Sequence, residues 1–373
     1  MKPKILIIIP TLALGGGAER VAATLTEKLS YKYHFYILTF YDSSQIYSHK
    51  GEYLCLEEDQ TSLTKLLIPF KLHRVISKLS PDLIISFMDH TNMVAIITKM
   101  MFRFKIPLIL SVRINPMRAY SETRKYYNML IKIFYKLNSV NKIITNANEI
   151  QSILENEYGV PKEKVITIPN AVDIGRIKEY SADNCNDNNH LFKNTNLTIF
   201  VNVGRLAESK NHKFLINAFS HVYNMNNKAR LAIIGDGPLR HYLKDYITKQ
   251  GLDEVIILLG LKKNPFCYLQ HSDVFVLSSK YEGMPNVILE AMACNLPIIS
   301  TNIPGAREIL QNGEYGILVK SEDVDALSNK MLLLMKNEEI RKNLREKSIK
   351  RIRDFDYNKI IERWDFEISK LLN

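Results

Sequence analysis

Residues 278–293 read Ser-Ser-Lys-Tyr-Glu-Gly-Met-Pro-Asn-Val-Ile-Leu-Glu-Ala-Met-Ala, which is the most informative stretch of the chain. Pro285 suits the first turn of a helix and Asn286 can cap it, so we expect a helix to begin here. Glu282 then lies on the preceding loop, and Glu290 lies one turn inside the helix, roughly 6 Å further along its axis. Two acids placed in this way can hold two different groups of one elongated ligand.

Both acids also have purely structural explanations. Glu282 could pair with Ser279 as in a capping box, but a glycine and a proline follow within three residues and disfavour a helix there. Glu290 could be a solvated helix position. Its neighbours are mostly apolar, however, and predict a largely buried helix in which an acid needs a partner. A ligand-binding role is therefore favoured for both.

Strand-like apolar runs alternate with helix-like segments over most of the chain. This alternation is typical of parallel α/β construction, and 373 residues suffice for two domains of about 150–180 residues each. Strands are expected at Lys4–Ile9, His34–Thr39, Leu83–Ser86, Pro107–Ser111, Lys142–Thr145, Leu197–Val203, Ala229–Ile234, Val255–Leu259, Val274–Leu277, Pro297–Ser300 and Gly316–Val319.

A polar run at residues 181–189, rich in turn-forming residues, predicts a linker between two Rossmann-like domains. We place the first domain at residues 1–180 and the second at residues 190–354. The segment that follows, about 355–373, is expected to be helical.

Glycine turns and two cations follow predicted strands, at the edge where open α/β sheets bind ligands. Gly16 and Gly17 lead into a helix whose N-terminus favours an anion. Arg205 and Lys210 follow the first strand of the second half and can converge on one diphosphate. Gly235 opens a second glycine turn. The alternative is that the glycines are needed only to form tight turns and bind no ligand. The absence of G-x-G-x-x-G disfavours a dehydrogenase.

The chain resembles the family-4 retaining glycosyltransferases of the GT-B fold, whose hallmark is E-x7-E. Glu282 and Glu290 have this spacing, within S-x-x-E-G-x-P-x-x-x-x-E-A-M-A. The other segments that match the family's landmarks, in order, are Gly15–Arg20, Ile168–Asp173, Val203–Arg205 with Lys210, Ile234–Pro238, Asp273–Val276, Pro304–Glu308 and Gly313–Gly316.

The resemblance implies two Rossmann-like domains whose parallel sheets face each other across a cleft. The first domain would bind the acceptor and the second the nucleotide sugar, with the helix at about 355–373 packing back on the first. Asn170 and Asp173 would belong to the connection between the domains.

The family's roles carry over onto matching residues. Glu290 would hold the ribose of the donor, Arg205 and Lys210 its diphosphate, and Glu282 the hydroxyls of its sugar. Backbone amides near Met284 would approach the sugar phosphate. The resemblance thus implies catalytic residues Glu282, Arg205 and Lys210, and donor-binding residues Gly16, Gly17, Gly235, Met284, Pro285, Asn286, Val287 and Glu290.

The sequence departs from the family in the first domain. Many members have a histidine after a strand like that at residues 107–111, where this chain has Arg113 in a segment resembling the S-x-R-N-x-P of surface-polysaccharide enzymes. Arginine cannot act as a base at pH 7, so Arg113 would stabilise the leaving phosphate or orient the acceptor. Residues 86–92 resemble a stretch in N-acetylgalactosaminyltransferases of lipid-linked oligosaccharide pathways. Asp89 or His90 would then touch the acceptor hydroxyl, with a structural turn as the alternative.

Charge is concentrated in residues 99–142, which hold ten Lys/Arg against one acid, Glu122, in a chain of net charge +11. Aromatic and methionine side chains lie between these cations. The pattern predicts a surface for an anionic membrane or a polyanionic acceptor, with a solvated helix face as the alternative. No nucleic-acid-binding module is present. No apolar run approaches the ~20 residues that span a bilayer, which predicts a soluble or peripheral protein. The four cysteines lie far apart and form no C-x-x-C or Cys/His cluster, which suits the reduced cytosol, so we expect a protein in the cytoplasm or on the cytoplasmic face of the membrane.

The expected reaction follows from the resemblance. A hexose or N-acetylhexosamine would move, with retention, from a nucleotide-diphosphate sugar, expected to be UDP-linked, to a glycan acceptor. The acceptor is expected to be lipid-diphosphate-linked, as in surface polysaccharide synthesis. The D-x-D at Asp323–Asp325 precedes a helix outside the other motifs, so no metal and no other cofactor is expected. A catalytically inactive nucleotide-sugar-binding protein and a GT-B-fold epimerase are the rival functions.

Overall fold

The computed structural model describes residues 1–12, 16–41, 48–56, 62–119, 125–182 and 196–372. The chain forms two compact units. Unit 1 comprises Met1–Ala171 and Asn358–Asn373, and unit 2 comprises Val172–Tyr357. Most of the predicted linker, residues 183–189, lies outside the described residues.

Unit 1 contains a seven-stranded parallel sheet in the order β3-β2-β1-β4-β5-β6-β7. In the central strand β1, all five residues from Ile5 to Ile9 are completely buried, as expected for a parallel strand covered on both faces. Leu6 pairs with Tyr36 on one side and with Ile84 on the other. The strands are β1 Lys4–Ile9, β2 His34–Thr39, β3 Glu52–Cys55, β4 Leu83–Phe87, β5 Leu108–Val112, β6 Lys142–Thr145 and β7 Val165–Thr167.

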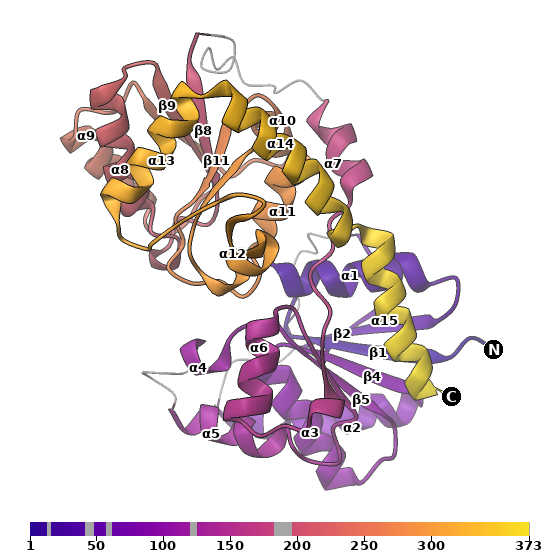
Figure 1. Ribbon diagram of the computed structural model, residues 1–373. Helices are drawn as coiled ribbons and strands as arrows, with labels where there is room; N and C mark the ends of the chain where they lie inside the picture. Colours follow the sequence, from indigo (N-terminus) through magenta and orange to yellow (C-terminus); the bar gives the residue numbers. More distant parts are fainter. Residues whose placement is uncertain (13–15, 42–47, 57–61, 120–124, 183–195, 373) are drawn as a thin grey trace. The chain divides into compact units, whose positions relative to one another are not determined.

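Helices cover both faces of this sheet. Figure 1 shows α1 and α15 on one side of the strands and α2, α3 and α5 on the other. The helices of unit 1 are α1 Gly17–Leu29, α2 Ser62–Leu79, α3 Asp89–Phe102, α4 Pro116–Ala119, α5 Lys125–Phe134, α6 Asn148–Ser152 and α15 Tyr357–Leu372.

Helix α15 follows unit 2 in the sequence but packs on the sheet of unit 1. Trp364 is 1% exposed and its indole stacks on the ring of Phe87. Arg363 donates to the carbonyl oxygen of Thr167 at 2.6 Å, and Lys32 forms a 2.8 Å ion pair with Asp365. The helix is therefore held by both apolar and polar contacts.

Unit 2 contains a six-stranded parallel sheet in the order β10-β9-β8-β11-β12-β13. Its strands are β8 Thr198–Val203, β9 Ala229–Ile234, β10 Ile256–Gly260, β11 Val274–Leu277, β12 Ile298–Thr301 and β13 Ile317–Val319.

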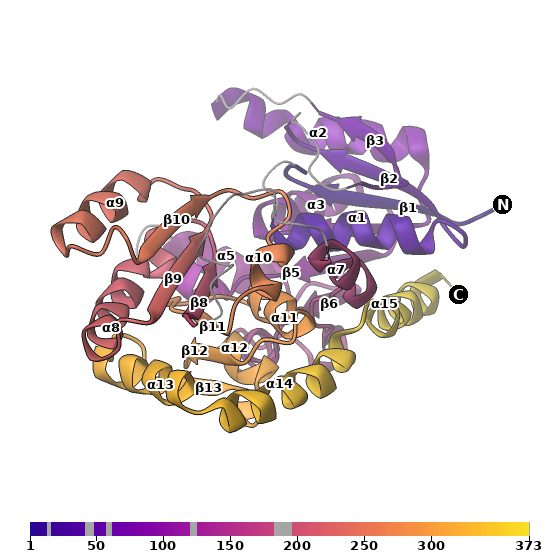
Figure 2. The same cartoon turned by 90° about the horizontal axis from the view of Figure 1, so that it is seen from above.

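Two helical layers cover the sheet of unit 2. Helices α8, α9 and α13 contribute to the core on one face, and α10, α11 and α12 to the core on the other (Figure 2). The helices of unit 2 are α7 Ile174–Ser181, α8 His212–Met225, α9 Arg240–Lys249, α10 Phe266–Gln270, α11 Asn286–Ala293, α12 Pro304–Ile309, α13 Val324–Lys336 and α14 Glu338–Ile352.

The predicted α/β class with two Rossmann-like domains is confirmed. The eleven expected strands are present with ends shifted by at most one residue, whereas β3 and β7 were missed. The units divide after Ala171 rather than at residue 180, because α7 packs against α10 and α11 of unit 2.

Candidate functional site

The predicted donor-binding residues of unit 2 follow the carboxyl ends of β8, β9 and β11, which are adjacent in the sheet. Gly235, with φ +143°, lies where β9 ends. A Cβ at this position would stand 2.0 Å from the carbonyl oxygen of Gly204, so only glycine fits. The two loops are joined by hydrogen bonds of 2.9 Å from the Gly204 amide to the Ile234 carbonyl and from the Leu206 amide to the Asp236 carbonyl. The cation-bearing loop is therefore fixed from one side by backbone contacts.

Lys210 and Glu282 meet at this edge. Nζ of Lys210 lies 2.7 Å from Oε1 of Glu282, and the two side chains are 21% and 14% exposed. Ser279 donates from Oγ to the same carboxylate oxygen at 2.6 Å. The Ser279–Glu282 contact considered from the sequence therefore forms, but in a loop and not in a helix. The Glu282 carboxylate is held by the Lys210 ammonium and the Ser279 hydroxyl.

Two further hydrogen bonds fasten the loop after β8 to the loop after β11. Ser278 donates from Oγ to the carbonyl oxygen of Lys210, and the Lys280 amide donates to the carbonyl oxygen of Ser209, both at 2.8 Å. Arg205, on the same loop as Lys210, is exposed to solvent. The arrangement offers an anion one ammonium held by its ion pair with Glu282 and one exposed guanidinium.

The loop before α11 is shaped by a second glycine. A Cβ at Gly305 would stand 2.1 Å from the carbonyl oxygen of Gly283 and 3.0 Å from the ring of Pro285. The first turn of α12 thus packs directly on this loop. Met284 and Pro285 are buried, while Asn286 and Val287 are half-buried. Helix α11 begins at Asn286, so Pro285, not Asn286, occupies the N-cap position, and no side chain caps the helix.

Glu290 lies one turn into α11 and is half-buried, whereas five of the other seven residues of this helix are buried. Its charge contributes, after burial, to raising the pKa of the Cys294 thiol to about 12. The helix as a whole is largely buried, as expected, but Glu290 itself is only half-buried. Glu290 is thus not fully enclosed by the packing of its helix.

His212 was missed by the sequence analysis. This first residue of α8 is 1% exposed, and its Nε2 lies 3.1 Å from Oδ1 of Asn202, whose Nδ2 donates to the carbonyl oxygen of Val276 at 2.8 Å. Burial, and then the charge of Lys210, lower the pKa of His212 to about 4. The available signal was Asn202, an amide near the end of the largely apolar strand β8, since a buried amide needs a partner.

In unit 1, Gly16 precedes α1 and Gly17 begins it, whereas Gly15 lies outside the described residues. Glu19 is 3% exposed, and Oε2 of its carboxylate lies 2.5 Å from where a Cβ at Gly16 would stand. Burial raises the pKa of Glu19. The helix N-terminus that was predicted to favour a ligand anion therefore lies next to a carboxyl group of the chain itself.

Asp89 and His90 begin α3 but differ in exposure. Asp89 is 5% exposed and accepts a 2.7 Å hydrogen bond from the hydroxyl of Tyr135, whose pKa is raised by burial and by this carboxylate. His90 is exposed and makes an edge-to-face contact with Phe40. Of the three predicted acceptor-side residues, Asp89, His90 and Arg113, only His90 is exposed.

Arg113 lies inside unit 1 and is 7% exposed. Nε donates to Oγ of Ser111 at 2.7 Å, and Nη1 donates to Oδ1 of Asn170 at 2.9 Å. The guanidinium also lies over the rings of Phe87 and Trp364, 5.7 and 5.5 Å from their centroids. Burial lowers the pKa of Arg113 to about 9. Arg113 is thus buried within unit 1, and the role toward substrate that the resemblance implied stays a prediction.

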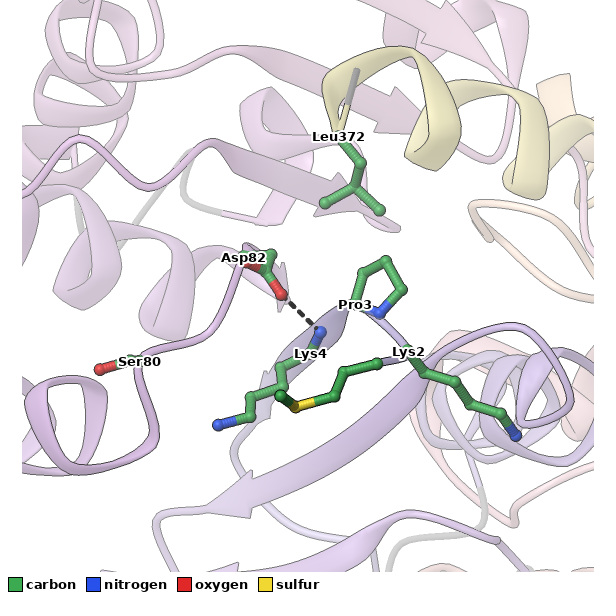
Figure 3. Close-up of a pocket in the computed structure, with 7 residues that line it drawn as sticks. Lys2, Pro3, Lys4, Ser80, Asp82 and Leu372 are labelled. Carbon is green, nitrogen blue, oxygen red and sulfur yellow. Dashed lines mark hydrogen bonds between the residues drawn. The ribbon is translucent and has the colours of Figure 1, made fainter.

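Two other features lie away from these residues. A hollow of about 430 Å³ at the amino end of β1 includes Lys4 and Asp82, whose Oδ2 accepts from the Lys4 amide at 2.7 Å (Figure 3). Ligands of open α/β sheets bind at the opposite, carboxyl end of the strands. Asp323 of the D-x-D caps α13 by accepting from the Ala326 amide at 2.9 Å. The described residues contain no group of three or more His, Cys, Asp or Glu that could hold a metal ion.

Comparison with known proteins gives a consistent result. Residues 15–176 match the family model described as Glycosyltransferase Family 4, and residues 184–351 match the model described as Glycosyl transferases group 1. A glycosyltransferase of Methanocaldococcus jannaschii is 34% identical over 357 residues, covering 83% of this chain and 86% of the relative.

Relatives with named activities and solved structures cover nearly the whole chain. A Campylobacter jejuni N-acetylgalactosamine-N,N'-diacetylbacillosaminyl-diphospho-undecaprenol 4-alpha-N-acetylgalactosaminyltransferase is 27% identical, covering 92% of this chain and 94% of the relative. Anabaena HepE, solved in complex with UDP and glucose, superposes with a TM-score of 0.82 at 18% identity, covering 99% and 100% of the two chains. At that identity the likeness concerns the fold, which is GT-B.

Proposed function

Because the chain belongs to glycosyltransferase family 4, we propose that it transfers a hexose or N-acetylhexosamine from a UDP-sugar to a lipid-diphosphate-linked glycan, with retention of configuration. Glycosyltransferase activity is shared by the relatives, and the donor, acceptor and stereochemistry are the proposed parts. The observation that carries the proposal is the Lys210–Glu282 pair, held at 2.7 Å on two loops at the carboxyl edge of the unit 2 sheet.

The donor would be bound by unit 2 through charges and hydroxyl contacts. Lys210 and Arg205 would hold the diphosphate, and Glu290 would accept hydrogen bonds from the ribose hydroxyls. Glu282, fixed by Lys210 and Ser279, would accept from hydroxyls of the sugar. The UDP complexes of HepE, which shares the fold, support the choice of uridine. Gly16 and Gly17 stay predicted diphosphate contacts.

Retention is proposed to occur without a protein nucleophile and without a metal ion. As the bond between the sugar and the diphosphate breaks, negative charge grows on the leaving phosphate. Lys210 and Arg205 would stabilise that charge, and fixed donors of this kind are worth more in the transition state than in the ground state. The leaving phosphate oxygen would take the proton of the attacking acceptor hydroxyl. EDTA should accordingly leave the rate unchanged, and restoration by manganese of a rate lost to EDTA would refute this step.

The acceptor is proposed from the relatives. Two Campylobacter jejuni enzymes and one Escherichia coli galactosyltransferase act on glycans linked to diphospho-undecaprenol. A chain that shares their family would work at the cytoplasmic face of the membrane, where such lipids are extended. An inactive nucleotide-sugar-binding protein and an epimerase are not favoured by these relatives.

Thermal unfolding tests the donor site directly. The protein would be heated with UDP, GDP or ADP and with sugar conjugates of each. A ligand at 100 times its dissociation constant adds about 2.7 kcal/mol, which raises the unfolding temperature by a few degrees. We expect a shift with UDP compounds that is lost in Glu290→Ala and kept in Glu339→Ala, an exposed glutamate of α14.

Release of UDP from the stabilising UDP-sugar, in the presence of an undecaprenyl-diphosphate-linked glycan, then tests turnover. Release that requires this acceptor supports the proposal. A folded protein that shifts with no nucleotide, or binds a UDP-sugar but never turns it over with any acceptor, would refute it in favour of a binding protein.

A further inference from the structure

Exposed apolar side chains are concentrated on three helices of unit 1. Eight of the 20 large apolar side chains that are exposed in the described ranges belong to α2, α3 or α5. Single exposed apolar residues are normal on a protein surface, but a gathering of this kind marks an interaction site. The eight are Leu66, Leu67, Phe70, Met100, Met101, Tyr126, Met129 and Ile133.

These three helices form one layer. Helix α3 packs against both α2 and α5, and Ile68, Ile96 and Ile131, one from each helix, join the same core cluster beneath them. Figure 1 shows all three on the same side of the strands. Their outer sides therefore make a common surface, which we call the α2–α3–α5 face.

Ring contacts and helical spacing place the apolar residues on this face. The ring of Phe102, which ends α3, makes an edge contact with Phe70 and stacks on His73 of α2, so the two helices share one apolar border. On α5, Tyr126, Met129 and Ile133 recur at i, i+3 and i+7 and are 64%, 58% and 51% exposed, so they line one side of the helix.

Within the described residues, the exposed charges of these three helices have a single sign. Helices α2 and α5 contain no acid, and the one acid of α3 is Asp89, which is buried. Exposed arginine and lysine side chains lie on the same helices as the apolar residues or directly after them. The exposed cations on these helices or directly after them are Arg74, Lys78, Arg103, Lys105, Lys132 and Lys136.

This face overlaps the basic stretch 99–142 that the sequence singled out, but the two are not identical. Lys99 is 9% exposed and donates to the carbonyl of Ile106 at 2.7 Å, while Arg113 is interior. Lys142 pairs with Glu367 of α15, which lies on the other side of the sheet. Conversely, α2 lies outside residues 99–142 and provides three of the eight apolar side chains.

We propose that the α2–α3–α5 face docks the protein on an anionic lipid bilayer, with apolar side chains entering the interface and the exposed cations binding head groups. Both parts of the surface match that occupant. A two-fold contact with a second copy would press together two faces whose described exposed charges are all positive, which costs electrostatic energy. None of the helices in the described ranges has the length and apolarity to cross a bilayer. The inference rests on the proposed function in one respect, because docking would bring the protein to a lipid-linked acceptor. Membrane binding itself is measured without acceptor or donor.

Co-sedimentation with vesicles tests the proposal. The full chain should sediment with phosphatidylcholine vesicles that contain phosphatidylglycerol, and less with phosphatidylcholine alone. Raising the salt concentration should release it, because the attraction to head groups is screened. The double variant Leu67→Glu/Met129→Glu should bind the anionic vesicles at least about 10-fold more weakly, since each substitution removes an inserted apolar group and adds a repelled charge.

Matched controls place the same change elsewhere. Phe366→Glu on α15 and Leu261→Glu in unit 2 alter side chains that are 65% and 81% exposed, and both variants should bind vesicles like the wild type. The proposal is overturned if the wild type ignores anionic vesicles, or if the controls weaken binding as much as the double variant does. It is also overturned if the double variant abolishes a solution dimer while vesicle binding stays intact. Vesicle binding and turnover of the UDP-sugar are measured separately. A protein that binds vesicles but never turns over a UDP-sugar therefore contradicts only the proposed function.

Discussion

Nη1 of Arg113 donates a 2.9 Å hydrogen bond to Oδ1 of Asn170, one residue before the first segment of unit 1 ends at Ala171. The same guanidinium lies over the ring of Trp364, in the helix with which the second segment of unit 1 returns. One buried side chain thus ties both segments of the unit together. A role in positioning the chain explains these contacts better than a role in binding substrate.

Arg113→Lys should therefore destabilise unit 1. A lysine cannot reproduce the forked donors to Ser111 and Asn170, and its desolvated ammonium would keep fewer partners. We expect a loss of about 2–4 kcal/mol in the free energy of unfolding, measured by urea titration, with the UDP-induced shift of unit 2 unchanged. Lys105→Ala, an exposed cation nearby in sequence, serves as the control. Unchanged stability combined with lost acceptor turnover would instead place Arg113 on the substrate.

Gly305→Ala should damage the donor site through sterics alone. The added methyl group would stand 2.1 Å from the Gly283 carbonyl oxygen, so α12 or the loop before α11 must move. Such overpacking typically costs about 1–3 kcal/mol, and UDP affinity should fall with it. Gly175→Ala in α7, where the nearest atom is 3.7 Å away, should be tolerated. Equal behaviour of the two variants in denaturation and UDP titration would contradict the argument.

Lys210 and Glu282 should separate donor binding from turnover. Lys210→Ala removes the charge that we propose holds the diphosphate, so calorimetry should show weaker UDP binding, by roughly 10-fold or more. Glu282→Gln keeps a side chain of the same shape and should leave UDP affinity within a few-fold while turnover of the UDP-sugar falls about 10²-fold or more. Lys280→Ala breaks only the surface pair with Glu322 and should change neither quantity. A Glu282→Gln enzyme of normal turnover would exclude the proposed sugar contact.

His212 should make stability depend on pH in mildly acidic solution. Its pKa falls from 6.5 to about 4 on folding, so the unfolded chain takes up the proton first. The stabilising contribution of neutral His212 is complete above pH 6.5 and is lost as the pH falls towards 4, by about 3 kcal/mol. The difference in unfolding free energy between wild type and His212→Gln should therefore shrink over this range. His241→Gln, at an exposed position of α9, should show no such trend.

The sequence predicted the two domains because buried parallel strands such as β1 leave long apolar runs. Strands β3 and β7 left no such signal: they form the two ends of the unit 1 sheet, β3 is mostly half-exposed, and β7 has three residues. The division at Ala171 also escaped prediction, because α7 is assigned to unit 2 only by its packing on α10 and α11.

The predicted donor residues are brought together in unit 2 because each follows a strand, and strand order places their loops side by side. The unit 1 residues were harder to assign. Asp89 and Arg113 also follow strands, but residues from distant parts of the chain contact them. Tyr135 contacts Asp89, and Asn170 and Trp364 contact Arg113. Which polar residue faces solvent at a sheet edge depends on such tertiary partners, and spacing alone does not report them.

Helix α15 also has a consequence for synthesis. Unit 2 is one continuous segment, whereas unit 1 needs residues on both sides of it. A ribosome must translate about 200 further residues after Ala171 before α15 is available, which takes about 10–40 s at common elongation rates. During that interval Phe87 and the sheet around it lack the Trp364 indole that covers them in the folded protein. The unit begun first is therefore finished last, and its uncovered sheet is the part of the nascent chain most in need of a chaperone.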